Sequence, residues 1–318
     1  MFSLYSLVLG VTAFTVLLLL PDTAYAWGPG THLQLGSQVL ENLAILTPAL
    51  RDLLKQNPYD FLYGCIGADI TVGKQYRIKQ VFHCHNWSMG FGLLEAAQEA
   101  HEAAFAYGYL CHLAADTVSH NYYVPTQEVA SYAATSLRHA YWEIRFDDFV
   151  DRKVWPLARV VHDEAHGRND GLLQRVLQDT LFSFRTNKRI FNGLISLQQV
   201  RHWRRMVQLM AERSNFPLTR PDFERYYGLA QNAVFAFMID GQRSRTCEAD
   251  PIGRRNLHAA TIIRKMLRTL SRRGVLSPTQ CEAIVREVRQ SLEVGLETAF
   301  RSPELLSLPS VRRLARAR

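Results

Sequence analysis

Apolar residues recur at helical spacing in most of this chain, and this pattern restricts the fold more than any other feature of the sequence. It predicts a long helix over residues 93–121, a second over 127–154, and a third from Pro278 to about residue 300. Residues 63–89 are rich in Gly, Tyr and Lys and are expected to form a loop. No run of β-branched residues alternates between Asn-Gly or Asp-Gly turns. The sequence therefore predicts an all-α bundle of several helices.

The first 26 residues have the pattern of an export signal. Residues 4–20 are almost unbroken apolar, and Ala24-Tyr25-Ala26 follows them as an A-x-A cleavage site. Neither Lys nor Arg precedes the apolar stretch, and its length lies at the lower limit for crossing a bilayer, so an uncleaved anchor is the alternative. We expect cleavage between Ala26 and Trp27 and export to the periplasm or the medium.

Composition places the chain among ordinary globular proteins, with 47% hydrophobic and 21% charged residues. Its five cysteines form no CxxC pair, which argues against a disulfide framework or a zinc ribbon. The net charge is +8, and residues 254–318 hold fourteen Arg or Lys against five Glu. Such a basic tail is usually a set of solvated helix faces. The alternative is a surface that binds anionic lipid or nucleic-acid phosphates.

Three side chains of the metal-binding type follow one another in the expected 93–121 helix. His112, Asp116 and His120 are spaced by four residues, which turns about 400° per step and keeps all three within an arc of about 80°. Each step climbs about 6 Å, a rise that suits neighbouring metals better than one ion. Apolar residues lie between them, so an Asp on this face would be costly unless a metal or hydrogen bonds satisfied it.

The mature N-terminus offers a second ligand set. Thr31 is expected to cap a helix over 32–46 that begins with His32. The free amine of Trp27 and its own carbonyl oxygen can chelate zinc in a five-membered ring, which the flexible Gly28 and Gly30 would allow. The amine must lose its proton, and its ordinary pKa of about 7.7–8.0 makes this accessible when a metal competes.

Two further segments carry candidate ligands. The 63–89 loop holds an Asp and a His-Cys-His run, and the 127–154 helix holds a His and a Glu four residues apart. Each of these side chains, taken alone, is more easily explained as a turn, packing or surface residue. The candidates are Asp69, His83, Cys84, His85, His139 and Glu143.

Taken together, these motifs resemble the zinc-dependent phospholipase C family, which also contains the single-strand-specific nucleases. The N-terminal part of glycosylphosphatidylinositol-specific phospholipase D is similar too. The resemblance covers roughly residues 27–152 and implies a phospholipase C/nuclease-like bundle with a metal cleft. We therefore expect a signal peptide over 1–26, a metal-site portion over 27–160, and a C-terminal helical portion with a basic tail over 161–318.

The resemblance also implies a site with three zinc ions, and it distributes the ligands among them. One ion would be held by Asp69, His85 (or His83), His112 and Asp116. The second would be held by the amine and carbonyl of Trp27, by His32 and by Asp116, and the third by His120, His139 and Glu143. The four-residue spacing from Asp116 to His120 is shorter than in several relatives. Between the two loop histidines we favour His85.

Such a site implies hydrolysis of a phosphodiester, because clustered zinc neutralises phosphate oxygens and lowers the pKa of a bound water toward 7. By resemblance, Asp69 is a candidate to accept the water's proton. The favoured substrate is a phospholipid, cleaved to diacylglycerol and a phosphorylated head group. The alternatives are an exported single-strand nuclease and a zinc-bearing membrane-binding protein without turnover. No protein partner is expected.

The aromatic residues near the motifs would line a lipid cleft or pack in the core: Tyr76, Trp87, Phe91, Tyr122, Tyr123, Tyr141 and Trp142.

Overall fold

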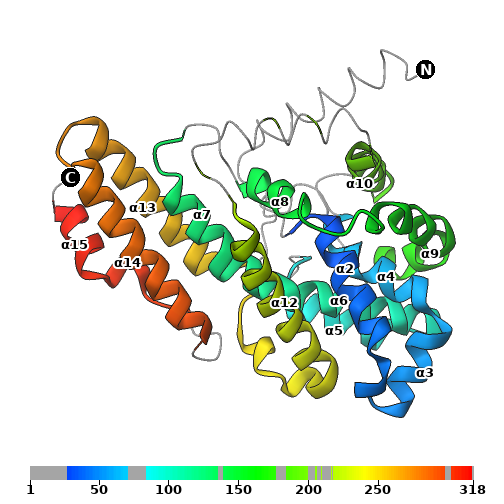
Figure 1. Cartoon of the computed structure of the whole chain (residues 1–318). Helices are drawn as coiled ribbons and strands as arrows, with labels where there is room; N and C mark the ends of the chain where they lie inside the picture. The colour runs from blue at the N-terminus through cyan, green and yellow to red at the C-terminus, as the bar shows by residue number, and fades with distance from the viewer. Residues whose placement is uncertain are drawn as a thin grey trace.

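A computed structural model describes residues 27–70, 84–134, 139–176, 184–199, 218–297 and 302–316, with isolated positions at 205, 209 and 216. Every regular element in these ranges is helical, which confirms the predicted all-α fold (Figure 1). The expected signal peptide, Tyr76 and His83 lie outside the described residues, and so does the side chain of His139.

The helices differ widely in length. In chain order they are α2 (Pro29–Glu41), α3 (Pro48–Gln56), α4 (Pro58–Gly67), α5 (Trp87–Ala96), α6 (Ala100–Val118), α7 (Val124–Ala130), α8 (His139–Asp147), α9 (Val154–Val176), α10 (Phe184–Gln199), α12 (Arg220–Asp240), α13 (Arg254–Arg272), α14 (Pro278–Glu297) and α15 (Pro309–Arg316). Short 3-10 turns are η1 (Leu43–Ile45), η2 (Ala68–Ile70), η6 (Gly241–Arg243), η7 (Arg245–Glu248) and η8 (Leu305–Ser307). Between α6 and α7 lies a π-helical turn, η5 (Ser119–Tyr123).

We call residues 27–160 the metal-site half, after the ligands predicted there. The helix α6 runs through its centre, and α4 crosses α6 at close range. A Cβ added to Gly64 would lie 2.0 Å from the Phe105 carbonyl oxygen, and one on Gly108 would lie 1.9 Å from the Phe61 carbonyl oxygen. Only glycine permits two backbones to come this close. The crossing brings the end of α4 and the following η2 beside the ligand-bearing part of α6.

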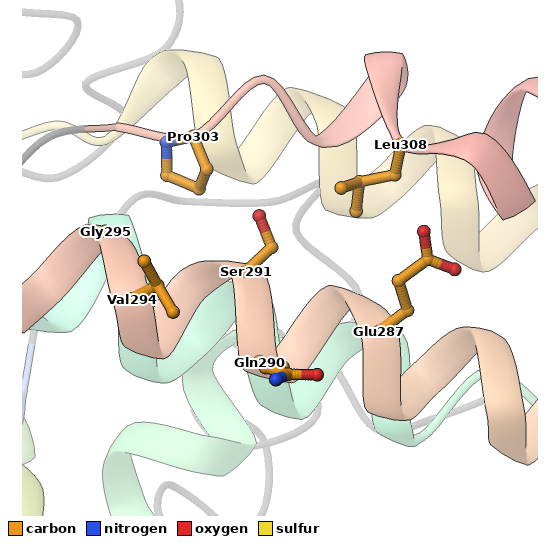
Figure 2. A pocket seen from close by; sticks show the side chains of 7 residues that line it. All are labelled: Glu287, Gln290, Ser291, Val294, Gly295, Pro303 and Leu308. Atoms are coloured by element: carbon orange, nitrogen blue, oxygen red, sulfur yellow. The ribbon is translucent and has the colours of Figure 1, made fainter.

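A second group of helices stands apart from the first in Figure 1. There α13, α14 and α15 pack on one another, and α13 and α14 also pack on α7, which continues the line of α6 through the π-helical turn. A pocket of about 420 Å³ opens between α14 and residues 303–308, and Figure 2 shows the side chains around it. None of the candidate metal ligands lines this pocket. The proposed boundary at residue 160 falls inside α9, which packs on α4 and α2.

The expected helix over 93–121 is wrong at both ends. The helix α5 ends at Ala96, and α6 begins only at Ala100. Pro125 does not stop the chain from being helical, because it lies in the first turn of α7, directly after the π-helical turn, and the Asn121 carbonyl four residues before it accepts from the Asn256 side chain instead. The helical run therefore continues from α6 through η5 into α7.

Three other expected boundaries are also wrong. The predicted helix over 127–154 is interrupted, since α7 ends at Ala130 and α8 ends at Asp147. Pro156 stands in the first turn of α9 instead of closing a helix. The expected 63–89 loop is shorter, because its first residues belong to α4 and Trp87 begins α5. Ser277 and Pro278 do begin α14 as predicted.

Within the part of the chain that the structure describes, no helix combines the length and apolar character needed to cross a bilayer. The described residues instead form one continuous apolar core, which runs from Trp27 to Leu314.

Candidate metal centre

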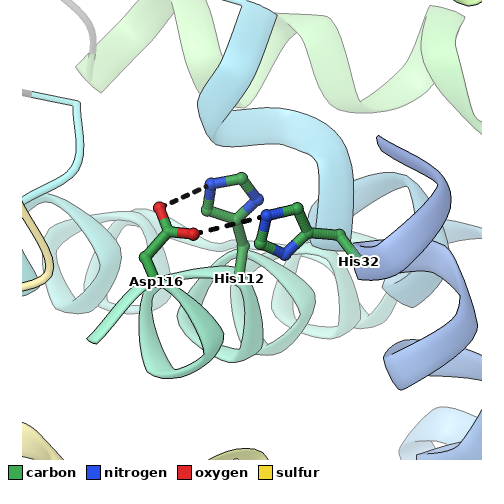
Figure 3. A group of neighbouring side chains, drawn as sticks. All are labelled: His32, His112 and Asp116. Carbon is green, nitrogen blue, oxygen red and sulfur yellow. Dashed lines mark ion pairs between the residues drawn. The ribbon is translucent and has the colours of Figure 1, made fainter. Parts of the chain in front are cut away.

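Five of the predicted ligands meet in the interior beside α6. His112 and Asp116 project from neighbouring turns of α6, and α2 brings His32 onto them, as Figure 3 shows. Asp69 comes from η2, at the end of α4, and His85 from the turn before α5. All five residues are at most 4% exposed. Four separate segments therefore bury ionisable groups at one point of an otherwise apolar core.

Four ligand-type atoms form the first cluster. The Nε2 atom of His112 lies 3.1 Å from Asp116 Oδ2 and 3.0 Å from His85 Nε2. His85 Nε2 also lies 3.2 Å from Asp116 Oδ2 and 3.3 Å from Asp69 Oδ1. The longest of these separations, 3.9 Å, joins His112 Nε2 to Asp69 Oδ1. Two imidazoles and two carboxylates thus present one atom each to a common centre.

Backbone contacts determine which nitrogen of His112 faces this cluster. His112 Nδ1 lies 2.9 Å from the carbonyl oxygen of Cys65. A carbonyl can only accept, so Nδ1 is the donor, and in the neutral ring Nε2 is the nitrogen that presents a lone pair to the cluster. His85 Nδ1 faces the thiol sulfur of Cys84 at 3.5 Å, so this cysteine supports the ring from behind and stands outside the two ligand groups. This is the arrangement in which metal-binding histidines are held from their second nitrogen.

The separations in the first cluster fit a tetrahedral zinc ion. Zinc bonds of about 2.0–2.1 Å to nitrogen and oxygen place tetrahedral ligands about 3.3 Å from one another. The contacts among His85, Asp69 and Asp116 lie at 3.2–3.3 Å. Both carboxylate oxygens of Asp116 are buried, and imidazole nitrogens lie 3.1–3.3 Å from them. A cation here would offset the cost of burying this negative charge.

The second group shares Asp116. The ring of His32 stacks on His112 with centroids 3.8 Å apart, and its Nε2 lies 3.3 Å from Asp116 Oδ1. The two oxygens of Asp116 thus face different imidazoles, Oδ1 toward His32 and Oδ2 toward His85 and His112. The Asp116 carboxylate therefore belongs to both groups, with one oxygen directed to each.

The ionisation of these groups suits a metal site. Burial, followed by the charge on His112, lowers the pKa of His32 to about 4, so its imidazole is neutral at pH 7 and can act as a ligand. Burial alone would raise the pKa of Asp116, but His112, His32 and His85 outweigh it and hold that pKa well below the ordinary value. A neutral imidazole and an ionised carboxylate are the forms that bind zinc.

Three other predicted ligands lie in the interior but belong to neither of the two groups. His120 is fully buried in η5, with its ring centroid 6.2 Å from that of His85. Glu143 is 4% exposed on α8. The Trp27 indole is fully buried and stacks on Phe146 at 4.8 Å, which fixes the residue just before the helix that carries His32.

Sequence reasoning missed Asp147, which organises the start of α2. Its carboxylate accepts hydrogen bonds from the backbone N–H of Gly30 (3.0 Å) and Thr31 (2.9 Å), and from the Thr31 hydroxyl (2.7 Å). Thr31 therefore does not cap the helix, which begins at Pro29. Burial raises the pKa of Asp147 to about 6. Its position four residues after Glu143 is a signal that could have identified it.

The aromatic residues near the motifs mostly belong to the core. Tyr122, Tyr123 and Trp142 are at most 1% exposed and Tyr141 is 6% exposed, so they do not line an open cleft. Trp87 and Phe91 are partly buried and stack with centroids 6.1 Å apart.

Comparison with known proteins gives one finding. The model of the family described as zinc-dependent phospholipase C matches residues 31–204, which is more than half of the chain. The chain belongs to the zinc-dependent phospholipase C family. Its domain is therefore that of a zinc hydrolase family whose substrates are phospholipids, and the buried His and Asp groups give zinc a place to bind. No curated protein and no solved structure matches the chain.

Proposed function

We propose that this family member is a zinc-dependent phosphodiesterase, specifically a phospholipase C that hydrolyses a phospholipid to diacylglycerol and a phosphorylated head group. The observation that carries the proposal is the convergence of His85, His112, Asp69 and Asp116 at separations of 3.0–3.9 Å. Two carboxylates and two imidazoles are a ligand set that suits zinc. The burial of the ionised Asp116 carboxylate among imidazole nitrogens at 3.1–3.3 Å supports a cation site over a packing role.

We assign the ligands of three zinc ions as the resemblance implies. Asp69, His85, His112 and Asp116 would hold the first ion. Support for this ion is the short distance of Asp116 Oδ2 from His85 Nε2 and His112 Nε2, while Asp116 Oδ1 faces His32. Trp27, His32 and Asp116 would hold the second, and His120, His139 and Glu143 the third. Support for the second is the contact of His32 with Asp116. Support for the third is the burial of His120 and Glu143.

Bound zinc would neutralise the anionic oxygens of the phosphodiester and make a water molecule acidic enough to attack it at neutral pH. The protein's own residues hold the charges that this chemistry needs. Asp116 supplies negative charge to two positions at once, and the Cys65 carbonyl keeps His112 in the ligating tautomer. We assign Asp69 to accept the proton of the attacking water.

The proposal is tested with purified, processed protein, phosphatidylcholine vesicles and, separately, single-stranded DNA. We expect phosphocholine to be released, and we expect a chelator to abolish this release until zinc is restored. Oligonucleotide products would favour the nuclease alternative. Zinc content without either product would favour a membrane-binding protein without turnover, and a protein free of zinc would contradict the proposal as a whole.

The second ion depends on processing at the N-terminus. We propose that removal of residues 1–26 and export release the Trp27 amine as a ligand. Gly28 and Pro29 place this residue directly before α2, so the amine and His32 belong to one short segment. A chain that begins with a retained Met before Trp27 should bind less zinc and lose most activity. An unchanged zinc content in that chain would argue against the amine as a ligand.

We also propose that the C-terminal helices contact anionic lipid. At the turn after α13, Arg272, Arg273 and Val275 are exposed, Val275 to 51%. Neither arginine makes an ion pair with another described residue, whereas Arg254 and Arg255 pair with Asp250 and Glu304. Unpaired cations beside an exposed apolar side chain suit an anionic membrane surface.

A further inference from the structure

The turn between η7 and α13 packs against the metal-site half of the molecule. This turn, residues 249–253, lies outside the region that the family model matches. Three of its backbone carbonyls accept hydrogen bonds from side chains of that half. Ala249 accepts from Trp87 Nε1 at 2.8 Å, Asp250 from the Asn121 amide at 2.8 Å, and Pro251 from His120 Nδ1 at 2.5 Å.

The contact with His120 determines the state of that imidazole. Because the Pro251 carbonyl can only accept, Nδ1 of His120 carries the proton and Nε2 keeps its lone pair. His112 is held in the same way by the Cys65 carbonyl. At both histidines, therefore, a backbone carbonyl holds Nδ1, as is usual for histidines that bind a metal through the other ring nitrogen.

Asn121, the residue after His120, joins both the 249–253 turn and the start of α13 to the π-helical turn. The Asn121 amide bonds both to the Asp250 carbonyl and, at 2.9 Å, to the Thr117 carbonyl. The backbone carbonyl of Asn121 also accepts a hydrogen bond of 2.7 Å from the side chain of the buried Asn256 in α13. These bonds hold the five-residue π-helical turn in register with the start of α13.

Gly253 makes this close approach possible. Its φ of +62° is in the left-handed region, and a Cβ there would lie 2.3 Å from the His120 carbonyl oxygen and 2.6 Å from its Cβ. Asp250 stabilises the turn from within, since its carboxylate accepts from the N–H of Ile252 and Arg254 at 3.1 and 3.3 Å. A side chain at position 253 would therefore displace the backbone of His120 itself.

From these contacts we propose that the 249–253 turn is a positioning element for a metal ligand. It holds His120 through Nδ1, which makes Nε2 the nitrogen that would bind a divalent cation, so the C-terminal part of the chain positions a ligand of a zinc site whose proposed ligands all lie in the metal-site half. The inference rests on the proposed function, because it takes His120 as a ligand. Gly253 and Pro251 act through His120 and are positioning residues.

The test compares two glycines with the same backbone strain. Gly274 has a φ of +70°, but no atom lies within 4 Å of the place where its Cβ would be. Gly253→Ala should lower the zinc content per chain to the level of His120→Ala, whereas Gly274→Ala should keep the wild-type content. Adding Gly253→Ala to His120→Ala should remove no further zinc. If Gly253→Ala keeps as much zinc as Gly274→Ala, the inference is wrong.

A measurement on the wild-type protein decides the matter if Gly253→Ala fails to fold. Nitrogen NMR of histidine-labelled apoprotein, with His120 assigned from its loss in His120→Ala, should show the tautomer protonated at Nδ1. A ring protonated at Nε2 would overturn the inference. If wild-type protein holds no zinc after incubation with zinc, the proposed function is refuted. If His120→Ala keeps the full wild-type zinc content, His120 is not a ligand and the inference is wrong, while the rest of the proposed function stands.

Discussion

The helices α6 and α13 have the same length, 19 residues, but bury very different side chains. Nearly all of α6 after residue 103 is buried, including His112, Asp116 and Thr117. The buried side chains of α13 are apolar except Asn256, which donates to a backbone carbonyl. Its arginines at 254, 255 and 272 are exposed, and those at 264 and 268 are partly buried. One helix thus follows the ordinary amphipathic pattern, and the other departs from it.

The difference separates packing from chemistry. Burying an ionisable group is unfavourable unless a partner satisfies it, and among the described side chains of α13 only Arg268 Nε is a buried ionisable atom without a hydrogen bond. In α6 the Asp116 carboxylate is fully buried and ionised, with three imidazoles around it. A helix that needed only to pack would not retain such a carboxylate. Changes in α6 should therefore act on zinc and activity, and changes in α13 on stability or surface binding.

The largest expected effect is that of Asp116→Asn. The amide keeps the size of the side chain but removes the charge that both ligand groups share, so activity should fall by about 10³-fold and zinc should be lost. Phosphocholine release and elemental analysis of the purified variant measure the two effects. His101→Ala on the same helix is the control and should keep its zinc. An Asp116→Asn protein with full zinc content would refute the bridging role.

Next in size is the effect of Leu267→Ala in α13. Leu267 is fully buried among apolar neighbours, and truncation should leave a cavity that lowers the free energy of unfolding by about 2–5 kcal/mol. Zinc content should stay at the wild-type level. Chemical denaturation measures the free energy of unfolding, and elemental analysis measures the zinc content. The control is Lys265→Ala at an exposed position of α13, whose free energy of unfolding should stay within about 0.5 kcal/mol of wild type. Zinc loss in the folded variant would show that the two regions are not separable.

A smaller effect should appear when the pH of the apoprotein is changed. Burial lowers the pKa of His32 to about 4, below its ordinary 6.5, so unfolding takes up a proton between these values. The stability that this group contributes is complete above pH 6.5 and is lost as the pH falls toward 4. Between pH 7 and 5 the loss should be about 2 kcal/mol.

Urea unfolding of the chelator-treated protein at both pH values measures this loss. His32→Gln should be less sensitive to acid than wild type by that amount, because glutamine takes up no proton. His258→Gln replaces an exposed histidine of α13 and should leave the wild-type pH dependence in place. Equal acid sensitivity of His32→Gln and wild type would mean that His32 is not held neutral in the fold.

Sequence patterns foresaw the helical fold and the pairing of His112 with Asp116, because residues four apart share a face wherever the helix begins. They could not foresee that Gly64 and Gly108 bring α4 against α6, since that close approach joins residues far apart in the chain. Pro125 was misread as a terminator because proline is tolerated in a first helical turn. The supporting carbonyl of Pro251 leaves no trace in the sequence, because every residue has a carbonyl.

The smallest effect on stability should come from charge reversal at the tip of α13. Arg272→Glu with Arg273→Glu changes exposed, unpaired cations, so unfolding should shift by less than about 0.5 kcal/mol and zinc content should not change. Binding to anionic phosphatidylglycerol vesicles should nevertheless weaken by about tenfold or more, since each cation near such a surface contributes about 1 kcal/mol. Sedimentation with vesicles at low and high salt measures this. Arg254→Glu reverses a cation already paired with Asp250 and should weaken binding less. If both changes weaken binding equally, the contact depends on net charge and not on the tip of α13.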